Sequence, residues 1–480
     1  MADRWTACSP PTPRPRTGSG RCARWRPGPV NPAPGAETAT FPQPERPAQP
    51  RRRQAPDPRA VAVDLLSEVL IRHRPADEAF EQAAEAARLE PRDRAFALNL
   101  VATTLRRLGQ IDAVIRRFLD RPLSARGAEA QNLLRLAVCQ LAFLQTPAHA
   151  AVHTAVALAG KRRSLRPYRG LVNAVLRRAA AQAEGIVAAQ DAALLNTPKW
   201  LWSSWEAAYG KAITRAIAGA HLSEAPLDLT PKDPDRSPED LGGDRLPTGS
   251  VRLRHHKGPI ASLPGYTAGD WWVQDAAAAL PARLFGALAG RRVIDLCAAP
   301  GGKTAQLAAA GADVVAVERG GERLRQLRGN LERLKLEADL VCADAAEWQP
   351  AEPADAVLLD APCSSTGTIR RHPDVARLKR PGDVASLAPL QARLLAAAAR
   401  MTRPGGTLIY CACSLQPEEG PAQVEALLAC GGLSRVPVEA DEIGGLAEAI
   451  TAEGDVRTLP CHLAAEGGMD GFYIARLRRL

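Results

Sequence analysis

Asp295-Leu296-Cys297-Ala298-Ala299-Pro300-Gly301-Gly302-Lys303-Thr304 is the stretch that decides the fold. An apolar run (292–294) precedes it and an alanine-rich run (304–310) follows it, so the pattern predicts a strand, a tight glycine turn and a helix start. Two adjacent glycines allow positive φ and a close approach of the backbone to a ligand. The helix N-terminus offers unpaired N–H groups to the polar end of a small molecule. An ordinary strand–turn–helix connection has the same pattern, and neither common phosphate-binding glycine spacing is present.

Acidic residues stand at the ends of three further predicted strands. The strands are expected at 313–317, 339–343 and 356–359, and they end at Glu318, Asp344 and Asp360. Carboxyl ends of parallel strands form the crevice in which such sheets bind ligands. Glu318 follows the glycine turn at the distance expected for an acceptor of ribose hydroxyls. The three acids therefore favour a ligand site over an ordinary turn.

Three motifs occur in a fixed order along the C-terminal part of the chain. They are Cys-Ala-Ala-Pro-Gly-Gly-Lys at 297–303, Asp-Ala-Pro-Cys-Ser at 360–364 and Tyr-Cys-Ala-Cys-Ser at 410–414. Together they resemble the Sun/Fmu family of S-adenosylmethionine-dependent RNA cytosine-5 methyltransferases over roughly the last 220 residues. The resemblance implies an α/β fold with a seven-stranded Rossmann-like methyltransferase domain.

The same resemblance implies S-adenosylmethionine as the cofactor and no metal site. Glu318 stands where relatives commonly have Asp, which lengthens the reach to the ribose without changing the role. The implied cofactor-binding residues are Cys297, Ala298, Ala299, Pro300, Gly301, Gly302, Lys303, Glu318, Asp344 and Asp360.

The chemistry at carbon 5 of cytosine requires a nucleophile and an acid. Carbon 5 reacts poorly with a methyl sulfonium, but a thiolate added to carbon 6 turns the ring into an enamine that can attack. Free cysteine has a pKa of about 8.5, so the site needs nearby positive charge or helix dipoles. A carboxyl group must hydrogen-bond the ring at N3 or N4, and Asp360 stands at a suitable strand end.

Two cysteines can supply the thiolate, and spacing alone cannot choose between them. Cys363 follows a proline, as the attacking thiol does in DNA cytosine-5 enzymes, and Cys413 ends the later motif. The family resemblance implies that Cys413 attacks and that Cys363 assists release. Either cysteine alone could be a small buried hydrophobe. Ala412 stands where relatives usually have Thr, and Cys411 replaces a small residue.

Composition divides the chain into four regions. Residues 1–55 are rich in proline and arginine and are expected to be disordered, or an upstream extension without a role. Residues 56–183 have helical periodicity and resemble the all-α NusB-like RNA-binding domain, notably at 134–137 and 170–176. Residues 184–265 are expected to form a small α/β insert, and 266–480 the methyltransferase domain.

Charge and composition bear on partners and location. The formal net charge is +10, and residues 101–180 hold 14 Lys and Arg against 3 Asp and Glu. Such a block is typical of an RNA partner, although a solvated helix surface gives the same excess. No apolar run is long enough for a membrane span, and the ten scattered cysteines indicate a reducing compartment. We therefore expect a cytoplasmic protein without a membrane span; the family resemblance implies that the polyanionic partner is RNA, and we expect a monomer.

One aromatic cluster and one basic cluster in 184–265 each allow more than one interpretation. Trp200, Trp202 and Trp205 could stack on RNA bases or pack between domains, and packing is favoured. A short basic cluster, Arg252 with Arg254-His255-His256-Lys257, lacks the further ligands that a metal site would need.

The predicted function is methylation of cytosine carbon 5 in RNA, most simply 16S ribosomal RNA. A catalytically silent RNA-binding assembly factor is the first alternative, and the retained Cys363, Cys413 and Asp360 argue against it. An amino-group methyltransferase is the second, and it would need an aromatic side chain where Cys363 stands.

Overall fold

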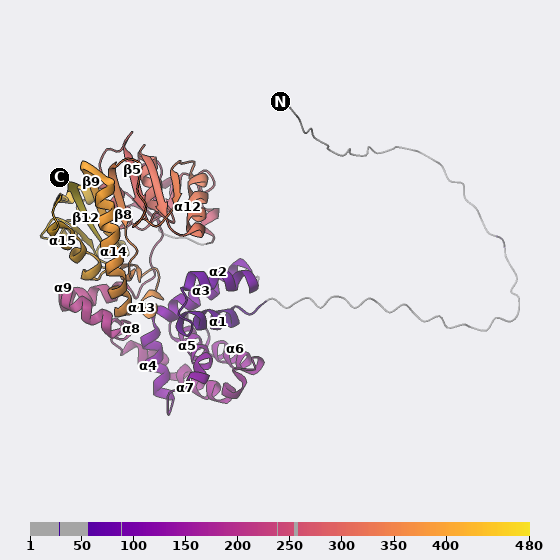
Figure 1. Ribbon diagram of the computed structural model, residues 1–480. Coiled ribbons are helices and arrows are strands. Elements are labelled where there is room, and N and C mark those ends of the chain that lie inside the picture. Colours follow the sequence, from indigo (N-terminus) through magenta and orange to yellow (C-terminus); the bar gives the residue numbers. More distant parts are fainter. Residues whose placement is uncertain (1–27, 29–55, 88, 238, 254–257) are drawn as a thin grey trace, which may run out of the picture. The chain divides into compact units, whose positions relative to one another are not determined.

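The computed structural model describes residue 28 and residues 56–87, 89–237, 239–253 and 258–480. The predictions for residues 1–55 and for Arg254, His255, His256 and Lys257 lie outside the described residues. The elements below all belong to one compact unit, 54–480 (Figure 1). Within the described ranges, no helix is both long and apolar enough to cross a membrane.

A bundle of helices forms the first part of this unit. Asp57 caps α1 by accepting a hydrogen bond from the Arg59 backbone N–H at 3.0 Å, and Pro58 occupies the first helical position, where no N–H is needed. Leu66 and Leu134 are fully buried in one apolar core. The helices are α1 (Pro58–Leu70), α2 (Ala76–Ala87), α3 (Pro91–Arg106), α4 (Leu108–Phe118), α5 (Ala128–Ala142), α6 (Ala148–Lys161) and α7 (Arg169–Ala188).

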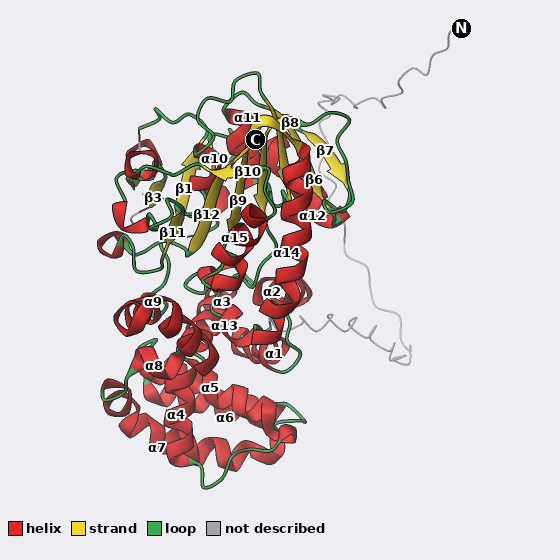
Figure 2. Ribbon diagram, turned by 60° about the vertical axis from the view of Figure 1, so that its left-hand side comes forward, coloured by secondary structure: helices red, strands yellow, loops and turns green. Residues whose placement is uncertain are grey.

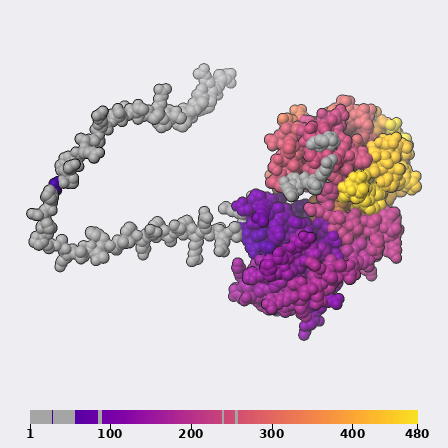
Figure 3. Space-filling view, turned by 180° about the vertical axis from the view of Figure 1, so that it is seen from behind, coloured from indigo at the N-terminus to yellow at the C-terminus, as the bar shows by residue number. Residues whose placement is uncertain are grey.

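Two further helices, α8 (Ala192–Asn196) and α9 (Lys199–Ala220), connect this bundle to the strands. Trp205 of α9 is fully buried, and its indole N–H donates to Gln416 Oε1 at 2.9 Å. The packing interpretation is confirmed for this tryptophan. In the space-filling view, α9 borders the yellow C-terminal residues (Figure 3).

A small antiparallel sheet follows, with strand order β2-β3-β1-β4. Three of its strands lie in the region expected to form a small α/β insert, and a strand from the region assigned to the methyltransferase domain completes the sheet. Arg252 is buried here and pairs with Asp228 at 2.6 Å, so it is a structural cation. The strands are β1 (Asp228–Pro231), β2 (Gly243–Arg245), β3 (Val251–Leu253) and β4 (Trp271–Val273).

The predicted methyltransferase sheet has the strand order β10-β12-β9-β8-β5-β6-β7, with β11 paired to β12 outside this path. The five strands from β9 to β7 in this order run parallel, and β12 is antiparallel to β9. The strands are β5 (Arg292–Leu296), β6 (Asp313–Glu318), β7 (Asp339–Cys342), β8 (Ala354–Asp360), β9 (Thr402–Ala412), β10 (Leu433–Arg435), β11 (Val456–Thr458) and β12 (Phe472–Arg479).

Helices cover both faces of this sheet (Figure 2). Successive side chains of a strand point to opposite faces. Val293 and Leu358 accordingly pack with Leu307 of α11 in one buried cluster, whereas Ile294 packs with Leu394 of α14 in another. The apolar run that opens β5 is explained by this two-sided burial. The helices are α10 (Leu280–Arg283), α11 (Gly302–Ala309), α12 (Gly321–Leu334), α13 (Val375–Leu378), α14 (Pro381–Met401) and α15 (Pro421–Ala429).

Candidate active site

The predicted cofactor loop joins β5 to α11. Gly301 has φ 102°, and a Cβ there would lie 3.1 Å from Leu327 Cγ, so this turn requires glycine. The loop is braced from α12, because Asn330 Nδ2 donates to the Pro300 carbonyl at 2.8 Å and Arg323 Nη2 donates to the Ala299 carbonyl at 2.6 Å. These two hydrogen bonds hold the loop backbone in its turn.

Glu318 and Asp344 lie at the ends of neighbouring strands, as predicted. Glu318 is buried, and its Oε1 accepts from the Gly320 N–H at 3.0 Å. The Ala299 N–H lies 3.4 Å from Glu318 Oε2, which joins this acid to the cofactor loop. Asp344, just beyond β7, is half-buried and accepts from the Ala346 N–H at 2.9 Å. Both acids retain an oxygen with spare acceptor capacity for hydroxyl or amino groups.

We expect Asp344→Ala to weaken S-adenosylmethionine binding, because polar groups of the cofactor would lose an acceptor. A lost hydrogen bond of this kind costs roughly 1–3 kcal/mol, or about 5- to 150-fold in affinity. Titration calorimetry measures the change. Asp313→Ala, at the opposite end of β6, is the control and should leave the affinity unchanged. Equal affinities in both variants would contradict the assignment of Asp344.

Lys303 does not simply line the cofactor loop. Its Nζ lies 2.8 Å from Asp360 Oδ2, and the ammonium is 5.2 Å from the centre of the Phe472 ring. Burial lowers the Lys303 pKa, but the Asp360 carboxylate together with Cys411 and Cys413 raises it, and the net effect is a raised pKa. Lys303 is therefore a fixed cation at the end of β8. The motif predicted its presence here but not its pairing with the second motif.

The two predicted thiols come together. Cys363 Sγ and Cys413 Sγ lie 3.3 Å apart, and both residues are half-buried. The hydrogen bond from Cys363 lowers the Cys413 pKa and correspondingly raises the pKa of Cys363, which burial raises further. The Ser365 hydroxyl, 3.7 Å from Cys413 Sγ, also lowers the Cys413 pKa. The pair therefore favours a thiolate on Cys413 and a proton on Cys363.

The third cysteine of this region, Cys411, behaves differently. It is fully buried, and its Sγ lies 3.5 Å from Asp360 Oδ1. Burial and the adjacent carboxylate raise its pKa well above the usual value, so it stays a thiol. Cys411 therefore donates its S–H to Asp360 and is a weaker nucleophile than a free cysteine.

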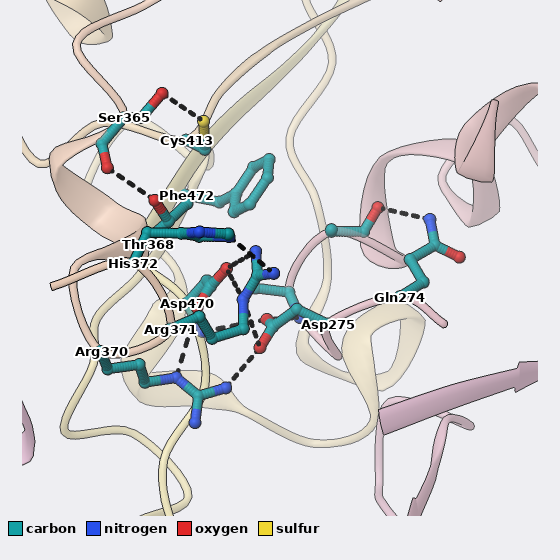
Figure 4. A network of polar contacts seen from close by, with 12 residues as sticks. Gln274, Asp275, Ser365, Thr368, Arg370, Arg371, His372, Cys413, Asp470 and Phe472 are labelled. Atoms are coloured by element: carbon teal, nitrogen blue, oxygen red, sulfur yellow. Dashed lines mark hydrogen bonds and ion pairs between the residues drawn. The ribbon is translucent and has the colours of Figure 1, made fainter. Parts of the chain in front are cut away.

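A buried charge network follows the Cys363 segment and was not predicted from sequence (Figure 4). Arg370 contacts Asp275 and lies 3.3 Å from Asp470, while Arg371 Nε donates to Asp470 at 2.8 Å. The backbone N–H of Asp470 in turn donates to Asp275 Oδ1 at 2.9 Å. These residues are far apart in the sequence, and no local pattern joins them.

Two glycines in contact fix the backbone near Cys413. The Gly367 N–H donates to the Cys413 carbonyl at 3.0 Å, and the Gly471 N–H donates to the Gly367 carbonyl at 2.9 Å. A Cβ on Gly367 would lie 1.8 Å from the Gly471 carbonyl oxygen. Three separate segments can meet here only because neither residue has a side chain.

The geometry thus joins two cysteine sulfurs and an acid–ammonium pair at the carboxyl ends of β8 and β9. Acids at the ends of β6 and β7 lie at the same edge of the sheet. Such a set can add a sulfur nucleophile to an electrophilic ring and stabilise charge that develops on ring nitrogens.

Comparisons with known proteins agree with this geometry. Residues 286–478 match the family described as 16S rRNA methyltransferase RsmB/F, and residues 56–181 match the NusB family. The ribosomal RNA small subunit methyltransferase B of Vibrio cholerae is 34% identical over 88% of this chain and 97% of its own length. The corresponding protein of Pseudomonas putida is 35% identical over 88% of this chain and 99% of its own length.

Solved structures share the fold. The crystal structure of PH0851 aligns with a TM-score of 0.68 at 21% identity and covers 88% of this chain and 99% of its own. NSun6 from Pyrococcus horikoshii aligns with a TM-score of 0.51 at 19% identity over 59% of this chain and 98% of its own. The family resemblance and the predicted fold class are confirmed. The chain therefore belongs to the RsmB family of ribosomal RNA small subunit methyltransferases and is an S-adenosylmethionine-dependent RNA methyltransferase.

Proposed function

We propose that this enzyme methylates carbon 5 of a cytosine in 16S ribosomal RNA through a covalent bond between Cys413 and carbon 6. The single observation that carries the proposal is the pair of thiols 3.3 Å apart, beside the Lys303–Asp360 ion pair. An amino-group methyltransferase has no use for a second thiol at this position. A silent assembly factor has no use for any of the four groups.

The first half of the reaction activates the ring. The Cys413 thiolate adds to carbon 6, and electron density moves to carbon 5 and to N3 and O2. The Asp360 carboxylate accepts a hydrogen bond from the N4 amino group, and the Lys303 ammonium, 2.8 Å from Asp360, holds that carboxylate in position and supplies positive charge beside it. Charge that develops on the ring therefore meets partners that are already held in place.

The cofactor site accounts for the second substrate. Bound S-adenosylmethionine supplies an electrophilic methyl group. Glu318 and Asp344 fit its ribose and adenine as acceptors, and the Gly301 turn fits a closely approaching ligand. The remaining loop residues of the predicted set, Cys297 to Gly302, contribute backbone to the same turn.

The second half of the reaction restores the aromatic ring. Once carbon 5 carries the methyl group, a base removes its proton and the electron pair expels the Cys413 sulfur from carbon 6. Cys363 lies close enough to act on this step, because its Sγ contacts the departing sulfur. Its proton can stabilise the Cys413 thiolate as that thiolate leaves.

Nucleoside analysis tests the proposal directly. Purified enzyme, S-adenosylmethionine and 16S ribosomal RNA should give 5-methylcytidine, which bisulfite sequencing locates at a single position. That position should be unmodified in a strain that lacks the gene. Formation of N4-methylcytidine, or no methyl transfer by folded enzyme, would refute the proposed chemistry.

The proposed RNA-binding role of the helical bundle depends on its positively charged side chains. Only some of these side chains are exposed and available to RNA, because others pair with acids of the protein. Several of the cations in 101–180 serve inside the protein: Arg135 pairs with Asp112 at 2.8 Å, and Arg162 pairs with Asp64 at 2.6 Å. The exposed cations are Arg116, Arg117, Arg121, Arg126, Lys161, Arg163, Arg166, Arg169, Arg177 and Arg178. Two of these exposed cations, Arg126 and Arg163, line a concave surface together with Tyr168 and other residues.

Replacing Arg126 and Arg163 together by Gln should weaken RNA binding and reduce its salt dependence. Each phosphate that the protein no longer neutralises lowers the slope of log affinity against log salt by about 0.7–0.9, because fewer counterions are released. The control is the double variant Arg393→Gln and Arg400→Gln on α14, which removes the same charge elsewhere. Equal slopes for both pairs would show that the bundle surface is merely solvated. The monomeric state and the cytoplasmic location stay predictions.

A further inference from the structure

Glu419 has a fully buried carboxylate that lies beside Cys363 and Cys413. The mechanism above does not use this carboxylate. It lies in a 3₁₀ turn, Pro417–Glu419, that follows β9. Its Oε1 accepts from the Ser364 backbone N–H at 2.8 Å and from Gln391 Nε2 at 3.1 Å. Its Oε2 accepts from the Ser364 and Ser414 hydroxyls, each at 2.5 Å. Both oxygens act only as acceptors, as an ionised carboxylate does.

The two serines place this carboxylate at the centre of the site. Ser364 directly follows Cys363, and Ser414 directly follows Cys413. These residues come from the ends of different strands, and their hydroxyls lie 3.2 Å apart. Glu419 therefore bonds the segment of one thiol to the segment of the other. Among the described residues, no ion pair involves Glu419, so its charge is stabilised by these hydrogen bonds alone.

We propose that Glu419 is a positioning residue that clamps the two cysteine segments together and thereby keeps the proton on Cys363 and the negative charge on Cys413. The proposal rests on the function proposed above, since it assigns these two protonation states to the release thiol and the nucleophile. The clamp itself is a property of the free enzyme.

Charges around the thiols agree in sign with this role. The Cys363 pKa is raised by the hydrogen bond to Cys413, by burial and by the negative charges of Cys413 and Glu419. The Cys413 pKa is lowered by the same hydrogen bond. Asp360 opposes a thiolate on Cys413 and Lys303 favours it. The other ionisable groups around the pair are Cys411, Tyr410 and Arg371.

Thiol alkylation in the free enzyme tests the clamp. Iodoacetamide labelling at a series of pH values, followed by mass spectrometry of each peptide, gives one midpoint for Cys363 and one for Cys413. In Glu419→Gln the two midpoints should converge. The midpoint of Cys363 should fall because a negative charge is removed. The midpoint of Cys413 should rise because the Cys363 sulfur is no longer held beside it. The exposed neighbour provides the control, Glu418→Gln, whose midpoints should match the wild type.

Turnover gives the second measurement. Glu419→Gln places an amide where Ser364 N–H and Gln391 offer donors, so the clamp loses acceptor capacity. Displacement of reacting groups by about 1 Å costs on the order of 100-fold in rate. We expect kcat to fall about 10- to 100-fold, with KM for RNA and the melting temperature close to those of Glu418→Gln.

A double-mutant cycle covers the case in which Glu419→Gln does not fold. Ser364→Ala and Ser414→Ala each remove one donor to the same Oε2 atom. If the serines act through one clamp, each variant lowers kcat and the double variant loses less than the product of the two factors.

Three results would overturn the proposal. They are unchanged midpoints in folded Glu419→Gln, turnover equal to that of Glu418→Gln, and independent or absent effects of the two serines. Labelling needs neither RNA nor cofactor, so its outcome is separate from whether the enzyme methylates carbon 5. Failure of the clamp and failure of the proposed chemistry are therefore distinguishable.

Discussion

Cys413→Ala should abolish methyl transfer and leave no covalent protein–RNA adduct. Without the Cys413 sulfur, carbon 6 has no attacking thiolate, because the remaining thiol, Cys363, holds its proton more tightly than a free cysteine. Loss of a nucleophile lowers turnover by on the order of 10⁴-fold or more. Radiolabelled methyl transfer to 16S ribosomal RNA measures the rate, and denaturing gels reveal the adduct.

Cys363→Ala should give the opposite appearance on the same gel. The Cys413 thiolate can still add to carbon 6, but the departing sulfur lacks its partner at 3.3 Å. Conjugate should therefore accumulate and survive denaturation, while product release slows. Cys430→Ala, at an exposed thiol, is the matched control and should behave as wild type. A stable adduct from Cys413→Ala and none from Cys363→Ala would reverse the two roles.

Lys303→Met should lower turnover by on the order of 100- to 1000-fold, the usual effect of removing one preorganised charge from an active site. Methionine has nearly the same length, so packing against Phe472 is retained while the ammonium bonded to Asp360 is removed. Single-turnover kinetics with saturating RNA separate this loss from weaker binding.

The control for Lys303→Met is Lys211→Met, at an exposed position of α9. Lys211→Met should retain wild-type turnover. If Lys303→Met instead weakens only cofactor affinity and leaves the single-turnover rate intact, Lys303 belongs to the cofactor loop, as the motif by itself predicted.

The sheet and most of the crevice could be predicted from the sequence, because both depend on local pattern. Buried parallel strands are continuous apolar runs, and their carboxyl ends meet at one edge, which placed Glu318, Asp344 and Asp360 together. Strand and helix ends were less exact. The strand expected at 356–359 spans Ala354–Asp360, and the strand expected at 339–343 ends at Cys342.

What the sequence did not predict depends on contacts between distant segments. Glu418 and Glu419 are adjacent and chemically identical, yet one is exposed and the other fully buried. Only the packing of the turn after β9 decides which of them faces the serines. The same holds for Asp275 and Asp470, which are 195 residues apart in the chain and both lie against Arg370.

The contact between Gly367 and Gly471 also bears on how the gene can vary. Every single-base change that alters the meaning of a glycine codon introduces a side chain or a stop. At Gly367 even the Cβ of alanine would lie 1.8 Å from the Gly471 carbonyl oxygen, a backbone atom, whereas at Gly471 the nearest atom to such a Cβ is the end of the Leu415 side chain, at 2.4 Å. Point mutation therefore offers no neutral amino-acid replacement at codon 367. In a saturation library selected for methylation, position 367 should be depleted of every residue but glycine, although Gly367 takes no part in the chemistry.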